Sequence, residues 1–451
     1  MIMVVLISAC AHKAPPQPTE LSIVLPDTYS LYEKAAPSPD RWWESFDSEE
    51  LNNLISDALE GSPELRISLA RLEQSRAQAV QAGADKWPDL DLKAGVSETR
   101  RSTGDETVID RSRSLTLASS WELDFWGSVR AQQKTALLSA EASREDLYAA
   151  ALTLSSEVTL KWLEIISVRR QLALFAQQLK TNRTILELIE LRYLKGLASA
   201  LDIYQQRQVV ADIEASLPQL EARLQTLHHE VAVLCGKPPR ADLKIEADTY
   251  PTLPPQPETG VPADLLAKRP DIRAAGLTLR AAENDITVAR AGRLPAVTLS
   301  GTAGFNSDSF SDLLEKWLTT LAANLTWPLF NSGSMDAEVA LRESIVRERL
   351  AAYEQAVLEA MREVEDAMVS EVKQTSYIAA LKAQLTISRD GFREAVSRYR
   401  KGLSDYLPVL SALTSTQRLE RSIVQAELER FSQRVKLHRA LGGGWMEEKF
   451  K

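Results

Sequence analysis

Few side chains in this sequence could do covalent or metal chemistry. The 451 residues include two cysteines and four histidines. The cysteines are too few and too far apart for a disulfide framework or a zinc site, and we interpret the pair His228-His229 as surface or packing residues. The nucleotide-binding fingerprints, the zinc-protease pattern and the serine nucleophile elbow do not occur. The sequence therefore predicts a protein that is not an enzyme and that holds neither metal nor cofactor.

The charge balance is acidic, with 62 Asp and Glu against 53 Lys and Arg and a net charge of −9. A nucleic-acid partner requires a basic face, and no dense block of Lys and Arg occurs. The sequence also contains no apolar run long enough for a transmembrane helix, which needs about 20 residues. We therefore expect no nucleic acid among the partners, and a membrane role through β-strands remains open.

The first residues resemble a bacterial lipoprotein signal. A short apolar stretch ends in Ile7-Ser8-Ala9-Cys10, and a Pro-rich stretch follows it. On this interpretation residues 1–9 are removed, Cys10 carries the lipid, and residues 10–47 form a tether and an extended segment. The alternative is a frayed N-terminus with an incidental free cysteine. Cys235 is the opposite case, because it follows an apolar helix and is best explained as a small buried side chain.

The sequence contains an internal repeat. Gly196 and Gly402 lie 206 positions apart, and so do Trp121 and Trp327. The segment that begins Arg-Tyr-Leu-Lys-Gly-Leu at residue 192 aligns with Arg-Tyr-Arg-Lys-Gly-Leu at residue 398. Each copy has the same order: a helix that ends near a Pro, two short alternating stretches, a very long helix and a further helix. We interpret the chain as a duplication of one unit of about 200 residues, too long for a solenoid repeat.

The alternating stretches predict four β-strands, two in each copy. Apolar and polar residues alternate over roughly ten residues in each, which gives one apolar and one polar face. A membrane strand needs about 9–11 tilted residues and commonly ends near aromatic residues, and Trp121, Trp126 and Trp327 lie where strands end. The alternative is two soluble hairpins with one face on a core. The predicted strands cover residues 89–99, 114–125, 296–306 and 318–329.

Two exceptionally long helices favour the membrane interpretation. Residues 128–194 contain no Pro or Gly, and residues 334–400 contain only Gly391. A helix of 67 residues would be about 100 Å long, several times the usual length in globular proteins. Such helices bury a stripe against partner helices, as in a coiled-coil assembly. Four strands cannot close a barrel in a membrane, so we expect several chains to share one, and a conduit favours three chains over two.

Several motifs in the expected order resemble TolC-type outer membrane factors. They are Arg-Trp-Trp-Glu-Ser-Phe at 41–46, Leu-Leu-Ala-Lys-Arg-Pro-Asp at 265–271, the two Arg-Tyr-x-x-Gly segments and the ending Leu-Gly-Gly-Gly-Trp at 441–445. The resemblance extends from about residue 40 to residue 445. It is greatest to the lipoprotein branch that serves resistance-nodulation-division efflux pumps.

This resemblance implies a mainly α-helical fold with a small β part. Three chains would form an α-helical barrel that continues into a shared 12-stranded transmembrane β-barrel. The implied partners are two further copies of the chain, a periplasmic adaptor (membrane fusion) protein, an inner-membrane efflux pump and outer membrane lipid. The implied location is the outer membrane, with a lipid anchor and an extension into the periplasm. The implied function is a passive duct that exports drugs or other toxic small compounds.

The resemblance also implies a gate at the periplasmic end of the helices. Gly196 and Gly402 would lie at the tips of two helix hairpins, where a reversal commonly needs a left-handed residue. Leu407 and Ser411 are four residues apart and would share a helix face. The residues that the resemblance places at the closed aperture are Arg398, Tyr399, Asp405, Leu407 and Ser411.

The predicted organisation divides the chain at the repeat boundaries. After the N-terminal segments come repeat 1 at residues 48–236, a linker at 237–261, repeat 2 at 262–445 and a tail at 446–451. Two other functions remain compatible with these features. A type I secretion duct for polypeptides would have the same fold and a different adaptor, whereas a soluble coiled-coil scaffold would share the helices but would not need the strands.

Overall fold

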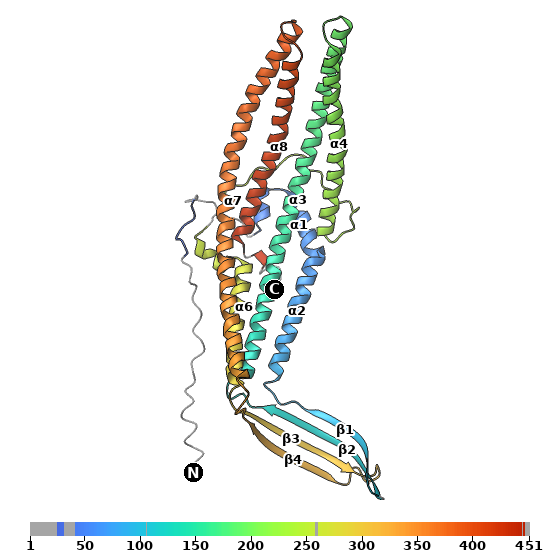
Figure 1. Ribbon diagram of the computed structural model, residues 1–451, viewed down its shortest axis with the longest axis vertical. Helices are drawn as coiled ribbons and strands as arrows, with labels where there is room; N and C mark the ends of the chain where they lie inside the picture. The colour runs from blue at the N-terminus through green and yellow to red at the C-terminus, as the bar shows by residue number, and fades with distance from the viewer. Residues whose placement is uncertain (1–24, 31–40, 105, 258–259, 444, 447–451) are drawn as a thin grey trace. The chain divides into compact units, whose positions relative to one another are not determined.

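The computed structural model describes residues 25–30, 41–104, 106–257, 260–443 and 445–446 (Figure 1). Cys10 and the predicted signal at residues 1–9 lie outside these residues. The described chain is mostly helical with one small sheet, and it forms two compact units. One unit contains residues 69–145 and 273–356, and the other contains residues 25–68, 146–272 and the chain from Val357 onward. None of the described helices is long and apolar enough to cross a membrane.

The first unit contains a four-stranded antiparallel sheet in the order β1-β2-β3-β4. The sheet begins with the hairpin of β1 (Asp91–Thr103) and β2 (Glu106–Glu122). The second hairpin is formed by β3 (Ala296–Ser307) and β4 (Trp317–Thr326). The first hairpin extends beyond the ranges that alternation predicted, because backbone pairing continues through charged residues that carry no apolar signal, such as Arg100 opposite Ile109.

The register of the sheet places most of its large apolar side chains on one face. Leu92 is opposite Leu117, Leu115 is opposite Phe305, and Phe305 is opposite Trp317. Directly paired residues share a face, so these side chains form a continuous surface. We call this surface the apolar face; its members are Leu92, Val96, Leu115, Leu117, Leu299, Phe305, Trp317, Leu321 and Leu325. Most of these side chains are exposed in the single chain.

Helices adjoin the sheet at the start of β1 and β3 and at the end of β2 and β4. They are α2 (Pro63–Ala84), α6 (Pro270–Ala291) and the first parts of α3 (Ser128–Leu194) and α7 (Ser334–Arg400). In this unit α6 packs on α7 through a cluster of Leu279, Ala282, Ile286 and Val346. All four connections therefore lie at the same end of the sheet, and the turns of both hairpins lie at the other end.

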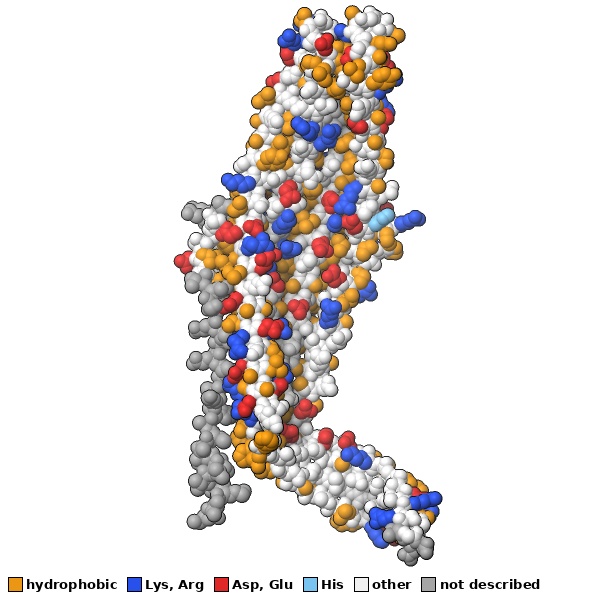
Figure 2. Space-filling model, in the orientation of Figure 1, with side chains coloured by type: hydrophobic (Ala, Val, Ile, Leu, Met, Phe, Trp, Pro, Cys, Tyr) orange, Lys and Arg blue, Asp and Glu red, His pale blue; other side chains and the backbone are white. Residues whose placement is uncertain are grey.

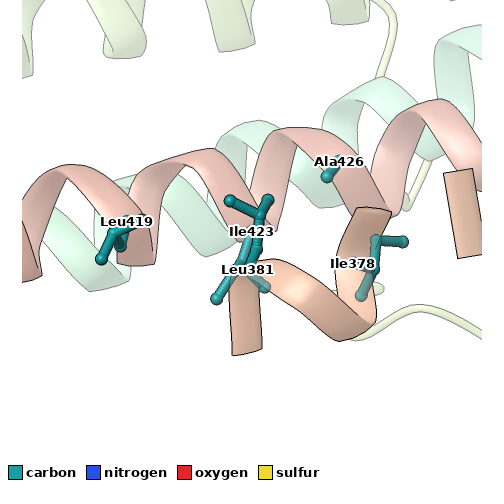
Figure 3. Close-up of a cluster of buried hydrophobic side chains, with 5 residues drawn as sticks. All are labelled: Ile378, Leu381, Leu419, Ile423 and Ala426. Atoms are coloured by element: carbon teal, nitrogen blue, oxygen red, sulfur yellow. The ribbon is translucent and has the colours of Figure 1, made fainter. Parts of the chain in front are cut away.

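The second unit contains the remainder of both long helices and the helices that follow them. These are α4 (Ala200–Leu234) and α8 (Leu407–Leu441). Both long helices contain 67 residues without interruption, which confirms their predicted length. Charged side chains are scattered over the surface of the helical part (Figure 2). In Figure 3, Ile378 and Leu381 of α7 face Leu419, Ile423 and Ala426 of α8. The spacing of three and four residues places these side chains on one side of each helix, so one apolar stripe on each is enough to pack α7 against α8.

The structure confirms the internal duplication. The helices α3 and α7 have the same length, α4 and α8 both contain 35 residues, and α2 and α6 both contain 22. Each copy also supplies one hairpin to the sheet.

Short helices complete the second unit. They are η2 (Trp42–Phe46), α1 (Glu49–Gly61), η3 (Pro262–Asp264) and α5 (Leu265–Lys268). The side chain of Ser48 caps α1 by accepting from the backbone N–H of Leu51. Trp42 stacks on His438 of α8, with the ring centroids 5.3 Å apart.

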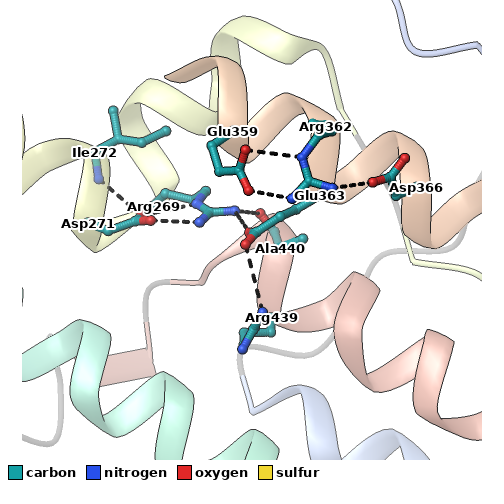
Figure 4. Close-up of polar contacts among 9 residues, drawn as sticks. All are labelled: Arg269, Asp271, Ile272, Glu359, Arg362, Glu363, Asp366, Arg439 and Ala440. Carbon is teal, nitrogen blue, oxygen red and sulfur yellow. Dashed lines mark hydrogen bonds and ion pairs between the residues drawn. The ribbon is translucent and has the colours of Figure 1, made fainter. Parts of the chain in front are cut away.

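The motif at the start of repeat 2 is explained by a buried arginine. Arg269 donates from Nε and Nη2 to Asp271, at 3.0 and 2.6 Å. Its Nη1 donates to Glu363 at 2.7 Å and to the carbonyl of Ala440 at 3.1 Å (Figure 4). A planar guanidinium suits such a bidentate carboxylate pair. This segment of the Leu-Leu-Ala-Lys-Arg-Pro-Asp motif therefore joins α6, α7 and α8 within the chain.

Candidate functional site: the helix-hairpin tips

Both helix hairpins turn at a glycine in the left-handed conformation. Gly196 has φ +71° and Gly402 has φ +73°. At the first tip, Gly196 N–H donates to Tyr193 O and Leu197 N–H donates to Arg192 O, both at 2.8 Å. The corresponding bonds at the second tip end on Tyr399 O at 3.0 Å and Arg398 O at 2.9 Å. This pair of bonds defines a Schellman motif, which explains the repeated Arg-Tyr-x-x-Gly sequence.

The two tips differ in how the next helix begins. At the first tip, Ser199 and Asp202 form a reciprocal capping box at the start of α4. At the second tip, Tyr406 occupies the position before α8, no side chain caps the helix, and Pro408 lies in its first turn. Proline is tolerated there because the first N–H groups of a helix have no partner within the helix. The second tip therefore begins its helix without the two side-chain hydrogen bonds that fix the first.

Four of the five residues predicted at the aperture are exposed in the single chain. They are Arg398, Asp405, Leu407 and Ser411. The side chain of Leu407 is 61% exposed. None of the described residues forms an ion pair with Arg398 or Asp405 within the chain.

Tyr399, the fifth residue predicted at the aperture, differs from the other four because its side chain is buried inside the chain. It packs with Ile189, Tyr406 and Val409 in a cluster that joins the two hairpins. The guanidinium of Arg192 lies 4.4 Å from the centre of the Tyr399 ring. Burial, opposed by the neighbouring Arg192 charge, raises the pKa of the Tyr399 hydroxyl. Tyr399 therefore connects the second tip to the first and does not join the four exposed residues.

Arg192 is the counterpart of Arg398 in the first repeat, yet it has a different environment. Besides its contact with Tyr399, it donates from Nη1 to the carbonyl of Arg400 at 3.5 Å and from Nη2 to that of Leu197 at 3.4 Å. The two arginines belong to the same Arg-Tyr-x-x-Gly motif, which by itself does not predict different environments. The structure shows that one arginine packs between the hairpins and the other is exposed.

A network of hydrogen bonds between buried polar side chains links the two hairpins near the tips, and no sequence motif predicts it. The hydroxyl of Tyr406 donates to Gln206 Oε1, and Gln206 Nε2 donates to Asn182 O at 2.8 Å and Asn182 Oδ1 at 3.0 Å. Farther along α3, Gln178 Nε2 donates to the carbonyl of Gln417 at 3.2 Å. Burial raises the pKa of Tyr406 above its usual range, so the hydroxyl is a donor at all physiological pH values. Uncharged polar residues on long helices form no recognisable pattern, so this hydrogen-bond network could not be predicted from the sequence.

The cysteine and histidine side chains in the described part of the chain do not gather into a metal site. No group of three or more His, Cys, Asp or Glu among the described residues could hold an ion. Cys235 is buried at the end of α4, as its apolar context predicted, and burial raises the pKa of its thiol to about 11. The ring of His228 contacts the carbonyl of Leu224 of the preceding turn at 2.8 Å.

Comparison with known proteins accounts for this arrangement. The model of a family described as outer membrane efflux protein matches residues 54–237 and 261–443. The chain is 34% identical to the pyoverdine export outer membrane protein OpmQ of Pseudomonas putida, over 92% of this chain and 90% of that protein. It is 31% identical to the outer membrane protein OprJ of Pseudomonas aeruginosa, over 92% of both.

A solved structure of the outer-membrane channel OprN superimposes with a TM-score of 0.87 at 28% identity, over 95% of this chain and 100% of that one. The family model matches more than half of the chain. The chain therefore belongs to the outer membrane efflux protein family.

Proposed function

We propose that three copies of this chain form the outer-membrane duct of a tripartite efflux system, with a gate at the second helix-hairpin tip. The observation that carries the proposal is a sheet with two open edges and an exposed apolar face. Both β1 and β4 pair with a single strand of the described chain. In lipid, unpaired backbone groups cost several kcal/mol each by order of magnitude, so the edges must be paired by other chains.

The strand count favours three chains. The smallest membrane barrels have eight strands, and such barrels are filled by their own side chains. Four strands from each of three chains give twelve, which leaves room for a passage. The apolar face would then contact lipid, and the polar residues that alternate with it would line the lumen.

The gate is proposed to consist of the four exposed residues of the second tip: Arg398, Asp405, Leu407 and Ser411. Around a threefold axis, the exposed Leu407 would be covered by its copies in the neighbouring chains. Arg398 and Asp405, which have no ionic partner within the chain among the described residues, would be free to pair between chains. Tyr399 is proposed to hold the second tip against the first.

The first tip is proposed to bind the periplasmic adaptor. Its exposed apolar side chains would be covered in the assembly; they are Leu194, Leu197, Leu201 and Tyr204. At the second tip only Leu403 and Leu407 are exposed leucines, which supports a division of labour between the two tips. An inner-membrane pump would supply the energy, and the duct would do no chemistry on its cargo.

The cargo is proposed to be small toxic or secreted compounds. The names of the relatives support this class, because one exports pyoverdine and another is the outer membrane protein of a toluene efflux pump in Pseudomonas putida. A lipid on Cys10 is proposed to anchor the N-terminus to the outer membrane. Replacing Cys10 with Ser should abolish labelling by palmitate while the trimer still forms, and persistent labelling would contradict the anchor.

The duplication supplies a matched pair of variants for testing the gate. Leu407 and Leu201 occupy equivalent positions in the two repeats and are 61% and 63% exposed. Leu407→Ala should raise single-channel conductance in a planar bilayer and leave adaptor binding unchanged. Leu201→Ala should reduce co-purification with the adaptor and leave conductance unchanged. Equal effects of both variants would contradict the division of labour.

The oligomeric state tests the duct itself. Native mass spectrometry of the detergent-extracted protein should give three copies per particle, and the particles should conduct ions. A stable monomer that dissolves in buffer without detergent would overturn the proposal and would favour a soluble scaffold.

A further inference from the structure

A group of arginines continues the apolar face of the sheet toward the β1–β2 turn. Along β2 the apolar face runs through Leu117 and Leu115, and the next residues on the same face are Arg113 and Arg111. On β1 the face runs through Val96 to Glu98 and Arg100. We call Glu98, Arg100, Arg111 and Arg113 the outer basic cluster. Three positive charges against one negative charge leave it cationic.

The cluster is held in place by its own contacts. The carboxylate of Glu98 lies between two guanidiniums, accepting from Arg100 Nε at 2.9 Å and from Arg111 Nε at 3.0 Å. Arg113 packs over the ring of Phe310 at 4.5 Å and donates to the carbonyl of Asp308. Glu98 therefore brings two arginines together instead of neutralising the whole group. The side chains of Arg100 and Arg111 remain 71% and 56% exposed.

The length of β2 places this cluster at the edge of the proposed lipid contact. The strand has 17 residues, whereas about 11 tilted residues cross the hydrocarbon core. Counted from Glu122, where the helices adjoin the sheet, the core ends near Ser112. Arg113 and Arg111 therefore lie at the boundary farthest from the helices. Phe305 is opposite Leu115 and Trp317 is opposite Phe305, so both aromatic residues lie beside Leu115, the last position on this face before Arg113, as aromatic residues do at a membrane interface.

The face of the sheet on which the cluster lies determines whether it contacts lipid or the lumen. In the proposed duct the apolar face contacts lipid, so the cluster on that face points toward lipid headgroups and not into the lumen. The helices extend into the periplasm, so the β1–β2 turn lies on the outer side. Arginine binds phosphate through charge-assisted, often bidentate hydrogen bonds, and basic clusters beside a membrane span are a recurrent feature of lipid recognition.

We propose that the outer basic cluster binds the phosphate groups of a phosphorylated glycolipid in the outer leaflet. This inference rests on the proposed function, since it needs the sheet to lie in the membrane. Arg100 Nη2 already lies 2.8 Å from Glu98 Oε1, so the headgroup would be bound by Nη1 of Arg100 and by both terminal nitrogens of Arg111. The acyl chains would lie along Val96, Leu115 and Leu117. Through this site the channel would bind the lipid that surrounds it.

The neighbouring Arg101 supplies a matched control. It lies on β1 next to Arg100, but its side chain is on the opposite face of the sheet, because it pairs with Val108 while Arg100 pairs with Ile109. The test compares the wild-type trimer with the Arg100→Gln/Arg111→Gln double variant and with Arg101→Gln. Native mass spectrometry would count the lipid A molecules that each trimer retains. Lipid A without phosphates and phosphatidylglycerol serve as further probes.

We expect the double variant to retain lipid A about tenfold less strongly, because it loses the charge-assisted hydrogen bonds of two guanidiniums to phosphate. The Arg101→Gln variant should bind as the wild type does, and the Arg100→Lys/Arg111→Lys variant should recover part of the binding. Neither dephosphorylated lipid A nor phosphatidylglycerol should bind comparably.

Three results would overturn the site: equal retention by the wild type and the double variant, equal loss in Arg101→Gln, or equal binding of phosphatidylglycerol. A conducting trimer with any of these results would leave the proposed function intact. Failure of the wild-type protein to enter a bilayer would instead refute the proposed function.

Discussion

At the scale of single residues, the second unit contains several buried polar side chains on α7 and α8. Arg434 of α8 forms a buried ion pair with Glu371 of α7 and also donates to the carbonyl of Pro255 at 2.9 Å. His438, one turn farther on, stacks on Trp42 and is buried. Burial, reinforced by the positive charge of Arg434, lowers the pKa of His438 to about 3. The imidazole is therefore neutral in the folded protein at physiological pH.

This environment of His438 predicts an acid-sensitive fold. In the unfolded chain the side chain has a pKa of about 6.5, so between pH 6.5 and 3 the unfolded state binds a proton that the folded state does not. The free energy of unfolding should therefore fall as the pH is lowered through this window, by up to about 1.4 kcal/mol per pH unit. His438→Phe keeps the stacking on Trp42 and removes the titration.

Urea unfolding followed by circular dichroism at pH 7 and pH 5 measures this effect. The wild type should lose about 2 kcal/mol more than His438→Phe over this interval. The carboxyl groups that also titrate are common to both proteins and cancel in the comparison. The same loss in both would show that His438 is not buried in its neutral form.

At the scale of elements, the two glycines of the second long hairpin have opposite roles. Gly402 has φ +73° at the turn, whereas Gly391 lies inside α7 with helical neighbours on both sides. A Cβ at either position would meet no atom within 4 Å, so steric crowding does not distinguish them. Only the backbone conformation does, because left-handed geometry is costly for residues with a Cβ.

This contrast predicts stability changes of opposite sign. Gly402→Ala should destabilise the turn by about 1 kcal/mol through the cost of left-handed geometry. Gly391→Ala should stabilise α7 by about 0.5–1 kcal/mol, because alanine has less conformational freedom to lose in a helix. Hydrogen exchange of amides near each position would report the two effects separately. Stabilisation by Gly402→Ala would contradict the Schellman turn.

At the scale of the whole molecule, the duplication gives two hairpins of equal length with different tips. The first has a capping box and an exposed apolar surface, and the second has neither cap nor comparable surface. Between them lie the buried contacts of Tyr399 with Arg192 and of Tyr406 with Gln206. These contacts hold the second hairpin against the first, so loosening them should favour movement of the second tip.

Loosening this connection should favour an open channel. Tyr406→Phe removes the hydroxyl and leaves Gln206 with a buried unsatisfied oxygen, at a cost of about 1–3 kcal/mol. We expect more frequent openings in a planar bilayer. Tyr377→Phe on α7 is the control, because that side chain is 52% exposed. Unchanged gating in Tyr406→Phe, with folding intact, would mean that the hairpins move without breaking this contact.

The helices, the strands and their duplication could be predicted from the amino-acid sequence alone. A stretch of 67 residues without Pro, and with no Gly or only Gly391, leaves few alternatives to one continuous helix, and alternation of apolar and polar residues specifies a two-faced strand. Self-comparison then located both turns, because Gly196 and Gly402 mark the same left-handed position in each copy. These are local properties, so they can be read from neighbouring residues alone.

The differences between equivalent residues of the two copies could not be predicted from the sequence, because they depend on contacts between distant segments. In the structure Arg192 packs on Tyr399, whereas Arg398 is exposed. Tyr399 is buried inside the chain, and Tyr406 donates a hydrogen bond to Gln206, which is 200 residues away in the sequence. The strands β1 and β2 also extend far enough to bring Arg100 and Arg111 onto one carboxylate. Such contacts depend on the packing of segments that are distant in the chain, so they cannot be predicted from the residues that neighbour a side chain in the sequence.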